Sequence, residues 1–444
     1  MTFKQNLIRA RSHLVFLAGL VTAFGLVISL ERWHPHAESQ NGVQAASTIE
    51  HTNSISPAAP AVLSEQQRQW AQIAWQYFEN NYQSSTGMVN STDAYPSTTL
   101  WDTSSYLMAL ISAERLQLIT AQKFDERVGL LLQSLSQLKL YDGKLPNKAY
   151  NTQSLQMVDY NNTPSELGIG WSAIDIGRVL VPFNILVWAN PQHTPAVKKL
   201  LSAWSFDALV QKAEIYGATV ENGQKVLVQE GRLGYEQYAA KSLGLLGIDV
   251  SSALDYRRYL GYVDVYGIKL PIDTRDPNKF KAHNYVVSEP YILDGLEYGW
   301  DQVSEEFAYR VYAAQQQRFE HTGQLTAVSE DNIDEAPYFV YNTIYTDGKT
   351  WQTITDQGAD ASKFRSISTK AAFGWNALYH TAYSEKLLQS LAGLNDPAKG
   401  WYSGLYETSA KPNKAITANT NAIILESLCY QQFGPLIRHS GTSQ

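Results

Sequence analysis

The chain has 444 residues, of which 44% are hydrophobic and 17% charged, so it is long enough to bury a large core in one domain or a few. Its formal net charge of −7 argues against a nucleic-acid-binding protein, because phosphate backbones require clustered basic residues. A single cysteine, Cys429, excludes an internal disulfide and a cysteine-ligated zinc site. The 27 tyrosines and 11 tryptophans can fill a core or form flat surfaces for sugar rings.

The amino terminus predicts a membrane anchor. Lys4, Arg9 and Arg11 precede an apolar stretch over residues 14–30 that contains no charged residue. This stretch has the minimum length of a membrane-spanning helix, about 17 residues, and basic residues before such a helix favour a cytoplasmic amino terminus. A cleaved signal peptide is the alternative, with small residues around Ala45 as its cleavage site and an exported, unanchored product.

The composition then divides the chain into four parts. We expect a signal anchor over residues 1–30 and a flexible linker over 31–63, because the latter is rich in Ala, Ser, Pro and Gln and lacks periodicity. A folded domain follows over 64–437, with a short tail over 438–444. The positive amino terminus places this domain in the periplasm of a bacterium, attached to the inner membrane by a single span.

Helix-like segments come in pairs from about Trp70 to Gln432, and a loop rich in Gly, Asn, aromatic residues and carboxylates separates the members of each pair. The pattern recurs about six times with a period of roughly 50–60 residues. It predicts an all-α fold, an (α/α)6 toroid of about twelve helices with long loops on one face; a right-handed helical solenoid is the alternative. The expected helices are 65–82, 103–118, 124–140, 171–187, 196–213, 233–246, 252–260, 291–298, 304–321, 366–379, 384–394 and 417–431.

The longest loop covers residues 324–365. Loops of more than about 12–15 residues are usually functional or disordered, and the aromatic and β-branched residues of this one argue against disorder. Residues 339–345 read as extended, and the Thr-Asp-Gly-Lys sequence at 346–349 is typical of a turn. A small β-hairpin is therefore expected on the loop face.

The same loop contains the densest group of acids, Glu330, Asp331, Asp334 and Glu335. Mutual repulsion raises the pKa of some carboxylates in such a group, and a glycosidase needs a protonated carboxylic acid to donate to the leaving oxygen. We therefore predict that Glu330 is a general acid, with Asp331 beside it as a further catalytic candidate. A helix start capped by Ser329 and a calcium-binding loop are the alternatives.

Two more catalytic candidates lie at expected helix starts. Glu236 opens an apolar helix rich in small residues, and Asp102 follows Trp101. Either would activate water opposite Glu330, because inner helices of a toroid begin at its loop-bearing end. A carboxyl separation of about 6.5–9.5 Å would then imply inversion of the sugar configuration, and about 5–5.5 Å retention. The structural alternatives are an ion pair of Glu236 with Arg232 and a helix cap at Asp102.

Acids beside aromatic rings recur in the other loops and provide the substrate-binding candidates. Asp175 lies deeper in its helix, where pairing with Arg178 is the favoured interpretation. No His-Glu-x-x-His sequence, phosphate loop or dinucleotide fingerprint occurs, so neither a metal nor another cofactor is expected. The candidates for binding sugar are Trp101, Asp159, Tyr160, Tyr235, Trp351, Trp401, Tyr402 and Glu407.

Several segments, in this order, resemble one bacterial family, catalogued as domain of unknown function 3131. The segments are 162–175, 234–240, 325–331, 368–375 and 417–421. The resemblance covers nearly all of residues 65–437. It implies a fold similar to the (α/α)6-toroid, glucoamylase-like glycoside hydrolases, although a fold does not determine a function.

These observations favour a membrane-anchored periplasmic glycoside hydrolase that cleaves a bacterial glucan or exopolysaccharide. A polysaccharide lyase, with Tyr or His as its base, would prefer uronic acids, and the few Arg and Lys residues in the loops argue against that substrate. The alternative of another class is a non-catalytic polysaccharide-binding or assembly subunit beside exopolysaccharide export machinery. Opposed carboxylates with room for water between them would favour the hydrolase.

Overall fold

The computed structural model describes residues 44–45 and 49–437. The predicted anchor over 1–30, the linker residues 31–43 and 46–48, and the tail over 438–444 lie outside the described residues. In the part that is described, no single helix has the length and apolar character of a membrane span. One helix pair, Ala173–Ala189 with Pro191–Ser202, meets both criteria together but is bent by 115°.

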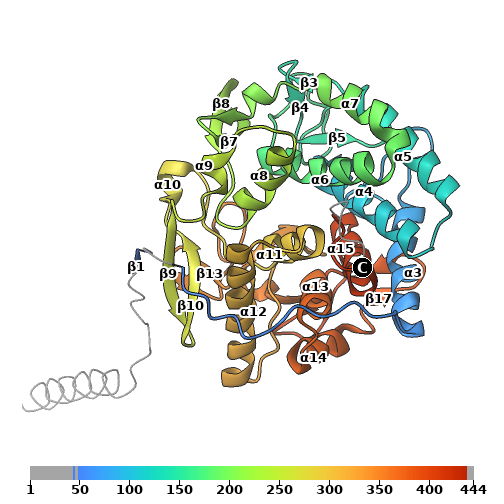
Figure 1. Ribbon diagram of the computed structural model, residues 1–444. Helices are drawn as coiled ribbons and strands as arrows, with labels where there is room; N and C mark the ends of the chain where they lie inside the picture. Colours follow the sequence, from blue (N-terminus) through green and yellow to red (C-terminus); the bar gives the residue numbers. More distant parts are fainter. Residues whose placement is uncertain (1–43, 46–48, 438–444) are drawn as a thin grey trace, which may run out of the picture. The chain divides into compact units, whose positions relative to one another are not determined.

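Apart from the short α10 (Pro277–Phe280), the described α-helices form two concentric rings (Figure 1). Each inner helix contacts the next, and α15 closes the ring against α4. The inner ring consists of α4 (Leu100–Arg115), α6 (Ala173–Ala189), α8 (Tyr235–Leu245), α11 (Glu289–Leu293) with its π-helical continuation η3 (Asp294–Tyr298), α13 (Thr369–Tyr379) and α15 (Ala418–Phe433).

Each outer helix packs against at least one inner helix. The outer ring consists of α3 (Glu65–Asn80), α5 (Ala121–Leu135), α7 (Thr194–Ser202), α9 (Ser251–Leu254), α12 (Gln302–Thr322) and α14 (Ala382–Leu391). For the described residues, the predominantly helical fold and the ring of paired helices predicted from the sequence are confirmed.

Small residues allow the inner helices to approach closely. A Cβ atom at Gly177 of α6 would lie 2.5 Å from the Cβ of Ala239 on α8. The buried hydroxyl of Ser104 on α4 donates a hydrogen bond to the carbonyl oxygen of Arg178 on α6, at 2.9 Å. Outer helices instead bury one face, and several begin at a side-chain cap that satisfies free backbone N–H groups. These caps are Ser64, Thr120, Asp301 and Thr381.

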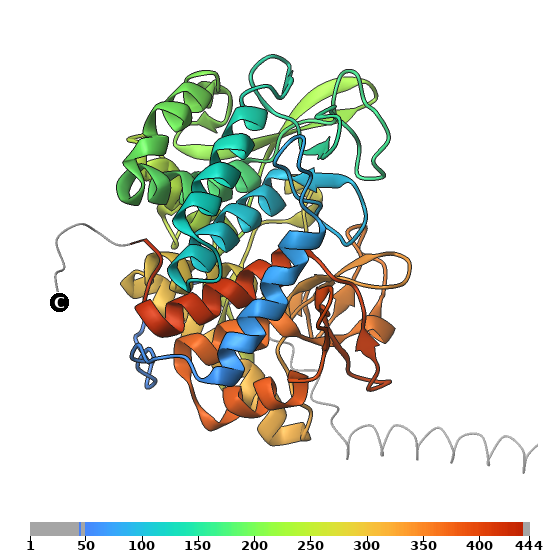
Figure 2. The same ribbon diagram turned by 90° about the vertical axis from the view of Figure 1, so that its right-hand side faces the viewer.

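Several small antiparallel sheets occupy the loops, where the sequence predicted one hairpin. Figure 2 shows many of these strands on one side of the helices, and Figure 1 shows β9 and β10 on the flank beside α12. The sheets are β2 (Ser97–Thr99) with β5 (Ala149–Asn151); β3 (Leu140–Tyr141) with β4 (Leu145–Pro146); β6 (Val210–Gln211), β7 (Glu214–Glu221) and β8 (Gln224–Gln229); β1 (Gln44–Ala45), β9 (Leu260–Val265) and β10 (Ile268–Asp273); β11 (Glu330–Asn332), β12 (Phe339–Asn342) and β15 (Thr353–Ile354); β13 (Tyr345–Thr346) with β14 (Lys349–Thr350); β16 (Ser366–Ser368), β19 (Gly404–Tyr406) and β20 (Pro412–Asn413); and β17 (Asn395–Asp396) with β18 (Gly400–Trp401).

Two expected helices are shorter than predicted. The helix expected over 196–213 ends at Ser202, and the chain then forms a 3-10 turn and strand β6. The helix expected over 252–260 is one turn, α9, and Leu260 already begins β9. In both places the following β-branched and aromatic residues pair as hairpins, β7 with β8 and β9 with β10, and this pairing overrides the helical periodicity.

Residues 49–63 contradict the predicted flexible linker, because they form an extended strap that is hydrogen-bonded to the domain. Glu306 of α12 accepts hydrogen bonds from the backbone N–H groups of Thr52 (2.8 Å) and Asn53 (2.9 Å). Farther along, the N–H of Ala58 donates to Leu378 and that of Ala61 to Gln431, each at 2.7 Å. Leu378 and Gln431 lie near the carboxyl ends of α13 and α15, so this part of the strap crosses the end of the ring where the inner helices finish.

The strap predicts a stability effect of Glu306. Replacement of Glu306 with Ala removes the contacts to Thr52 and Asn53 and leaves Arg310, which is buried and bonded to Glu306 at 2.6 Å, without that partner. We expect the free energy of unfolding, measured by chemical denaturation, to fall by about 2–4 kcal/mol. The exposed Glu320→Ala change on the same helix is the control and should cost less than about 0.5 kcal/mol. Equal effects of the two changes would contradict the role of the strap.

Candidate functional site

The inner helices α4 and α6 begin with the same arrangement. Thr99 caps α4, accepting from the N–H of Asp102 and donating to its carboxylate at 2.9 Å. Ser172 caps α6 in the same way, with its hydroxyl 2.8 Å from the carboxylate of Asp175. Because α4 and α6 are neighbours, the two half-buried acids lie at adjacent positions around the ring.

The side-chain partners of these two acids are hydroxyl groups. Among the described residues, neither acid forms a salt bridge within 4 Å, so no cation neutralises it at that distance. Burial raises the pKa of Asp102 above its ordinary value. Burial raises the pKa of Asp175 to about 7, and the negative charge of Glu230 is the next contribution. Asp175 is therefore partly protonated at neutral pH.

Glu230 approaches from the segment before α8. Its carboxylate accepts a hydrogen bond from the N–H of Ala173, in the first turn of α6, so a negative charge lies at the start of that helix. The Glu230 carboxylate passes close to Gly217. A Cβ atom at Gly217 would lie 2.6 Å from this carboxylate, so there is no room for a side chain. Burial raises the pKa of Glu230, and nearby Lys148 opposes the shift.

Glu330 and Asp331 point to opposite faces of the small sheet, because successive strand residues alternate. Glu330 is 8% exposed; it accepts a hydrogen bond from Ser329 at 2.9 Å, and burial raises its pKa. Asp331 faces the helices, 3.7 Å from Lys370, and burial raises its pKa to about 8. One oxygen of Asp331 has no hydrogen-bond partner in the described part of the chain.

The capped helix start considered as an alternative for this segment is wrong, because residues 330–332 form strand β11. Pairing with β12 holds the strand extended. Across residues 44–45 and 49–437, no group of three or more His, Cys, Asp or Glu side chains is arranged to hold a metal ion.

Glu289 connects four inner helices near these acids. Its carboxylate, at the start of α11, accepts from Lys370 on α13, from the indole N–H of Trp101 on α4 at 3.2 Å, and from Asn419 on α15 at 2.9 Å. The guanidinium of Arg178 lies 4.5 Å from the centre of the Trp101 ring. These contacts fix Trp101 from two sides.

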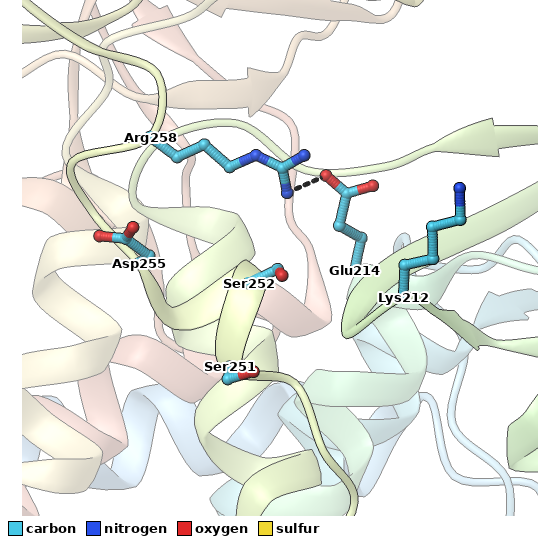
Figure 3. A pocket seen from close by; sticks show the side chains of 6 residues that line it. All are labelled: Lys212, Glu214, Ser251, Ser252, Asp255 and Arg258. Atoms are coloured by element: carbon cyan, nitrogen blue, oxygen red, sulfur yellow. Dashed lines mark ion pairs between the residues drawn. The ribbon is translucent and has the colours of Figure 1, made fainter.

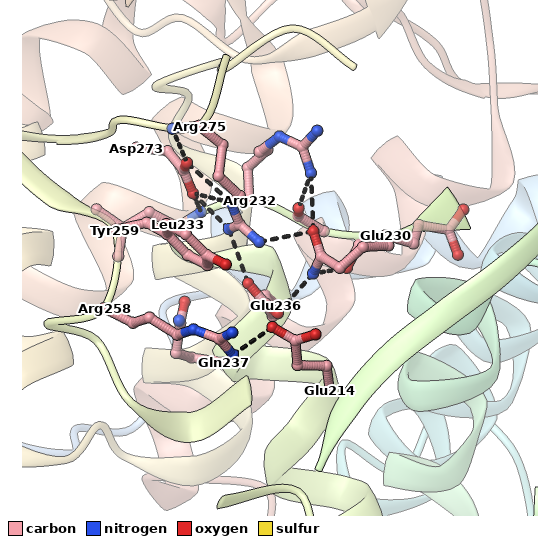
Figure 4. A network of polar contacts seen from close by, with 12 residues as sticks. Glu214, Glu230, Arg232, Leu233, Glu236, Gln237, Arg258, Tyr259, Asp273 and Arg275 are labelled. Atoms are coloured by element: carbon pink, nitrogen blue, oxygen red, sulfur yellow. Dashed lines mark hydrogen bonds and ion pairs between the residues drawn. The ribbon is translucent and has the colours of Figure 1, made fainter. Parts of the chain in front are cut away.

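Glu236 lies in an ion-pair network, which contradicts its predicted role in activating water. Its two oxygens bind Arg275 and Gln229, each at 2.7 Å, and Arg275 also binds Asp273 (Figure 4). The partner is thus Arg275 and not the expected Arg232. Figure 4 also shows that the Glu230 carboxylate points away from this network. Both Glu236 oxygens already have partners, so this carboxylate does not offer a free base.

Three predicted sugar-binding residues are instead structural. Trp401 is fully buried, and its indole N–H donates to the carbonyl oxygen of Trp70 at 3.1 Å, so it cannot stack on a sugar. Glu407 forms a bidentate ion pair with Arg318, at 2.7 and 2.8 Å. The same Arg318 lies 4.9 Å from the centre of the Trp351 ring and covers it.

The remaining candidates differ in accessibility. Asp159 accepts hydrogen bonds from the N–H groups of Asn161 and Thr163, at 2.9 and 2.8 Å, and so holds its own loop. The next residue, Tyr160, is 64% exposed. Tyr235 packs edge-on against Trp101, with ring centres 5.6 Å apart. Tyr402 is half-buried against the core.

Sequence reasoning missed Asp175 as a free acid because it assigned Arg178 as its partner. Arg178 is instead enclosed in the ring, 3.4 Å from Glu297 and 3.5 Å from Glu426. A usable signal was present: Thr99-x-x-Asp102 and Ser172-x-x-Asp175 place a capping hydroxyl three residues before an acid at two successive inner helices. The partnership of Glu289 with Lys370, far apart in sequence, had no such signal.

Two of the surface hollows lie elsewhere. One, of about 400 Å³, is lined by Lys212, Glu214, Ser251, Ser252, Asp255 and Arg258 beside α9, with Arg258 paired to Glu214 (Figure 3). The other lies between α3 and α14 and includes Trp70 and His380. Neither hollow includes the carboxylates of Asp102, Asp175, Glu230 or Glu330.

Comparison with known proteins assigns the family. The family model described as "Protein of unknown function (DUF3131)" matches residues 69–434, and the chain belongs to this family, as the sequence motifs indicated. No curated protein sequence matches the chain.

Solved structures share the fold. A putative glucoamylase from Bacteroides caccae ATCC 43185 has 11% identity and a TM-score of 0.60, with 84% of this chain and 94% of that chain covered. An endo-beta-1,2-glucanase from Chitinophaga pinensis, in complex with sophorotriose and glucose, has 14% identity, a TM-score of 0.59 and the same coverage. An endo-beta-1,2-glucanase from Talaromyces funiculosus, in complex with sophorose, has 12% identity, a TM-score of 0.58 and 84% coverage of each chain. At these identities the likeness shows a shared fold alone.

The raised pKa of Asp175 predicts a pH-dependent stability effect. An unfolded Asp titrates near pH 4. Protonated Asp175 therefore stabilises the folded state fully below about pH 4, and this contribution is lost as the pH rises through about 7. Asp175→Asn removes the ionisation, so its melting temperature relative to the parent should be higher at pH 8 than at pH 5, by a few degrees. An equal difference at both pH values, measured by calorimetry, would contradict this assignment.

Proposed function

We propose that this DUF3131 protein is a glycoside hydrolase that cleaves a neutral bacterial glucan by carboxylate general acid–base catalysis. The observation that carries the proposal is a set of acids without a salt-bridge partner within 4 Å among the described residues. Asp102, Asp175 and Glu230 lie at the amino-terminal starts of α4 and α6. Glu330 comes from strand β11 beside α13. In contrast, Glu236, Glu289 and Glu407 bind cations.

The acids come from two sides of the ring. In the order of contacts around the inner ring, α13 stands three positions from α6, which places the two helices opposite one another. Asp331, adjacent to Glu330, contacts Ser368 and Lys370 at the start of α13. A sugar chain between Asp175 and Glu330 would thus have one carboxylate on each side, as glycosidic cleavage requires.

The environments of the two acids suggest different roles. The pKa of Asp175, about 7, is suited to a proton donor at neutral pH. The positive charge of Lys370 opposes the effect of burial on Glu330 and favours its ionised form. We therefore assign Asp175 as general acid and Glu330 as general base, the reverse of the sequence-based role of Glu330. Asp175 protonates the glycosidic oxygen as its bond to the anomeric carbon breaks, while Glu330 takes a proton from the attacking water.

The charge of the site favours a neutral sugar. Among the described residues, these four acids form no salt bridge within 4 Å, while nearby Lys370 is already bound to Glu289. An anionic uronic acid would meet repulsion without compensation, which argues against a lyase. The shared fold with endo-beta-1,2-glucanases supports a glucan as the substrate class. The apolar stretch at 14–30 supports periplasmic action beside the inner membrane, where exopolysaccharide assembly machinery would be a neighbour.

A non-catalytic polysaccharide-binding subunit is the second candidate. It is favoured by one observation on the two surface hollows, one beside α9 and the other between α3 and α14. Neither of them is lined by Asp102, Asp175, Glu230 or Glu330. Such a protein would need aromatic surfaces but no proton donor with a raised pKa.

Hydrolysis tests the proposal directly. The full-length protein is incubated with a panel of bacterial glucans and exopolysaccharides, and new reducing ends are measured. We expect cleavage by the parent and a loss of about 10²–10⁴-fold in kcat for both Asp175→Asn and Glu330→Gln. The control is Glu335→Gln, an exposed acid in the segment that follows β11, which should retain activity. Binding of a glucan without cleavage by the parent would favour the binding subunit.

The pH dependence provides a separate check on the acid. Activity should fall as the pH rises above about 7, because Asp175 then loses the proton that it must donate. Glu230→Gln removes a negative charge that raises the pKa of Asp175, so the alkaline limb of the kcat/KM profile should move to lower pH. An unmoved limb would exclude Asp175 as the titrating acid.

A further inference from the structure

We propose that Tyr285 and Tyr341 form a binding subsite for one pyranose ring of the glucan, directly beside Glu330. The inference deepens the proposed function and rests on it for the identity of the ligand. It starts from the register of the small sheet, and nothing in the sequence motifs pointed to these two tyrosines.

The register places Tyr341 next to Glu330. The two residues are direct partners in the antiparallel pair of β11 and β12, and Asn332 is paired with Phe339. Directly opposed residues project their side chains from the same face, with Cβ atoms about 4.5–5.5 Å apart. A sugar ring held against the stack of Tyr285 and Tyr341 would therefore lie on the same face of the sheet as the Glu330 carboxylate.

The face of β12 opposite to Tyr341 holds the strand against the domain. Val340 and Asn342 are fully buried, whereas Phe339 and Tyr341 are half-buried, so burial alternates along the strand. Anchoring of the strand thus comes from the Val340 face. The tyrosine face remains partly open to solvent, which a residue serving only the core would not require.

The two tyrosines form a rigid, preorganised stack, in which each ring covers one face of the other and a sugar ring can rest only on an outer face. Their rings are parallel within 2°, with centres 3.8 Å apart, although Tyr285 comes from a different segment. The ring of Phe339 packs at 84° to that of Tyr341, with a centre distance of 5.2 Å, and restricts its motion. Rigid aromatic surfaces bind the apolar faces of pyranose rings with little loss of conformational entropy.

The hydroxyl groups add hydrogen-bonding capacity. In the described part of the chain, no hydrogen bond is formed by the hydroxyl of Tyr285 or Tyr341. Burial raises the pKa of Tyr341, and the neighbouring Tyr285 and Glu330 raise it further. The Tyr341 hydroxyl therefore stays protonated and can donate to a sugar oxygen. Tyr160, exposed in another loop, also lies close enough to influence this pKa. These features match a neutral, hydroxyl-rich ligand.

Binding measurements test the subsite apart from catalysis. The host is full-length protein carrying Asp175→Asn, and the probes are sophorotriose, cellotriose and laminaritriose, measured by isothermal titration calorimetry. We expect at least one triose to bind, and Tyr341→Ile or Tyr285→Leu to raise its Kd by about tenfold. Tyr341→Phe keeps the ring and should lose less affinity than Tyr341→Ile.

A matched control is available in Tyr266→Leu. Tyr266 is exposed and stacked on His321, with ring centres 4.8 Å apart, so it resembles Tyr285 in setting but lies in the turn between β9 and β10. This change should leave the Kd unaltered, and melting temperatures of all variants check that the fold is intact. A folded Tyr285→Leu variant with parental affinity, or no binding of any triose by the host, would overturn the subsite.

The outcome is separable from that of the proposed function. Loss of triose binding in the tyrosine variants, together with absence of hydrolysis by the parent, would support the subsite and overturn the hydrolase. Hydrolysis that depends on Asp175 and Glu330 but not on either tyrosine would do the reverse.

Discussion

The buried carboxylate of Glu289 is the contact on which the centre of this ring depends. It receives hydrogen bonds from side chains of three other inner helices, through Trp101, Lys370 and Asn419. A buried carboxylate without such partners would cost several kcal/mol, so the helix starts are held together by the need to neutralise it. Lys370 extends the link to Asp331, and through it to the strand that presents Glu330.

A second buried charge completes the inner ring. Arg178 of α6 is enclosed between Glu297 and Glu426 and packs over the Trp101 ring. Tyr238 of α8 donates to Glu297 at 2.6 Å, so this network adds α6 and α8, the two inner helices to which Glu289 forms no hydrogen bond among the described residues. Together, the two charged centres place side chains from all six inner helices in contact, which gives the acids around them a rigid frame.

That frame separates two classes of acid. Glu236, Glu289 and Glu407 bind fixed cations and serve the structure, whereas Asp102, Asp175, Glu230 and Glu330 bind hydroxyl or backbone N–H groups. Hydroxyl partners satisfy part of a carboxylate without neutralising it, so burial can raise its pKa. The second class is therefore suited to proton transfer, and the proposed catalytic pair is drawn from it.

The sequence by itself determined the ring, because apolar periodicity, capping residues and paired spacing are local properties that repeat along the chain. It also determined the family and the acid-rich segment at 330–335. Tertiary structure decided which acids are free: Arg275 and Arg318 reach Glu236 and Glu407 from distant segments, and Lys370 reaches Glu289 across 81 positions. It decided likewise that Trp401 belongs to the core and that Tyr285 meets Tyr341. Partners separated by long stretches of chain leave no local pattern, so the charge and exposure of a side chain emerge only when the ring closes.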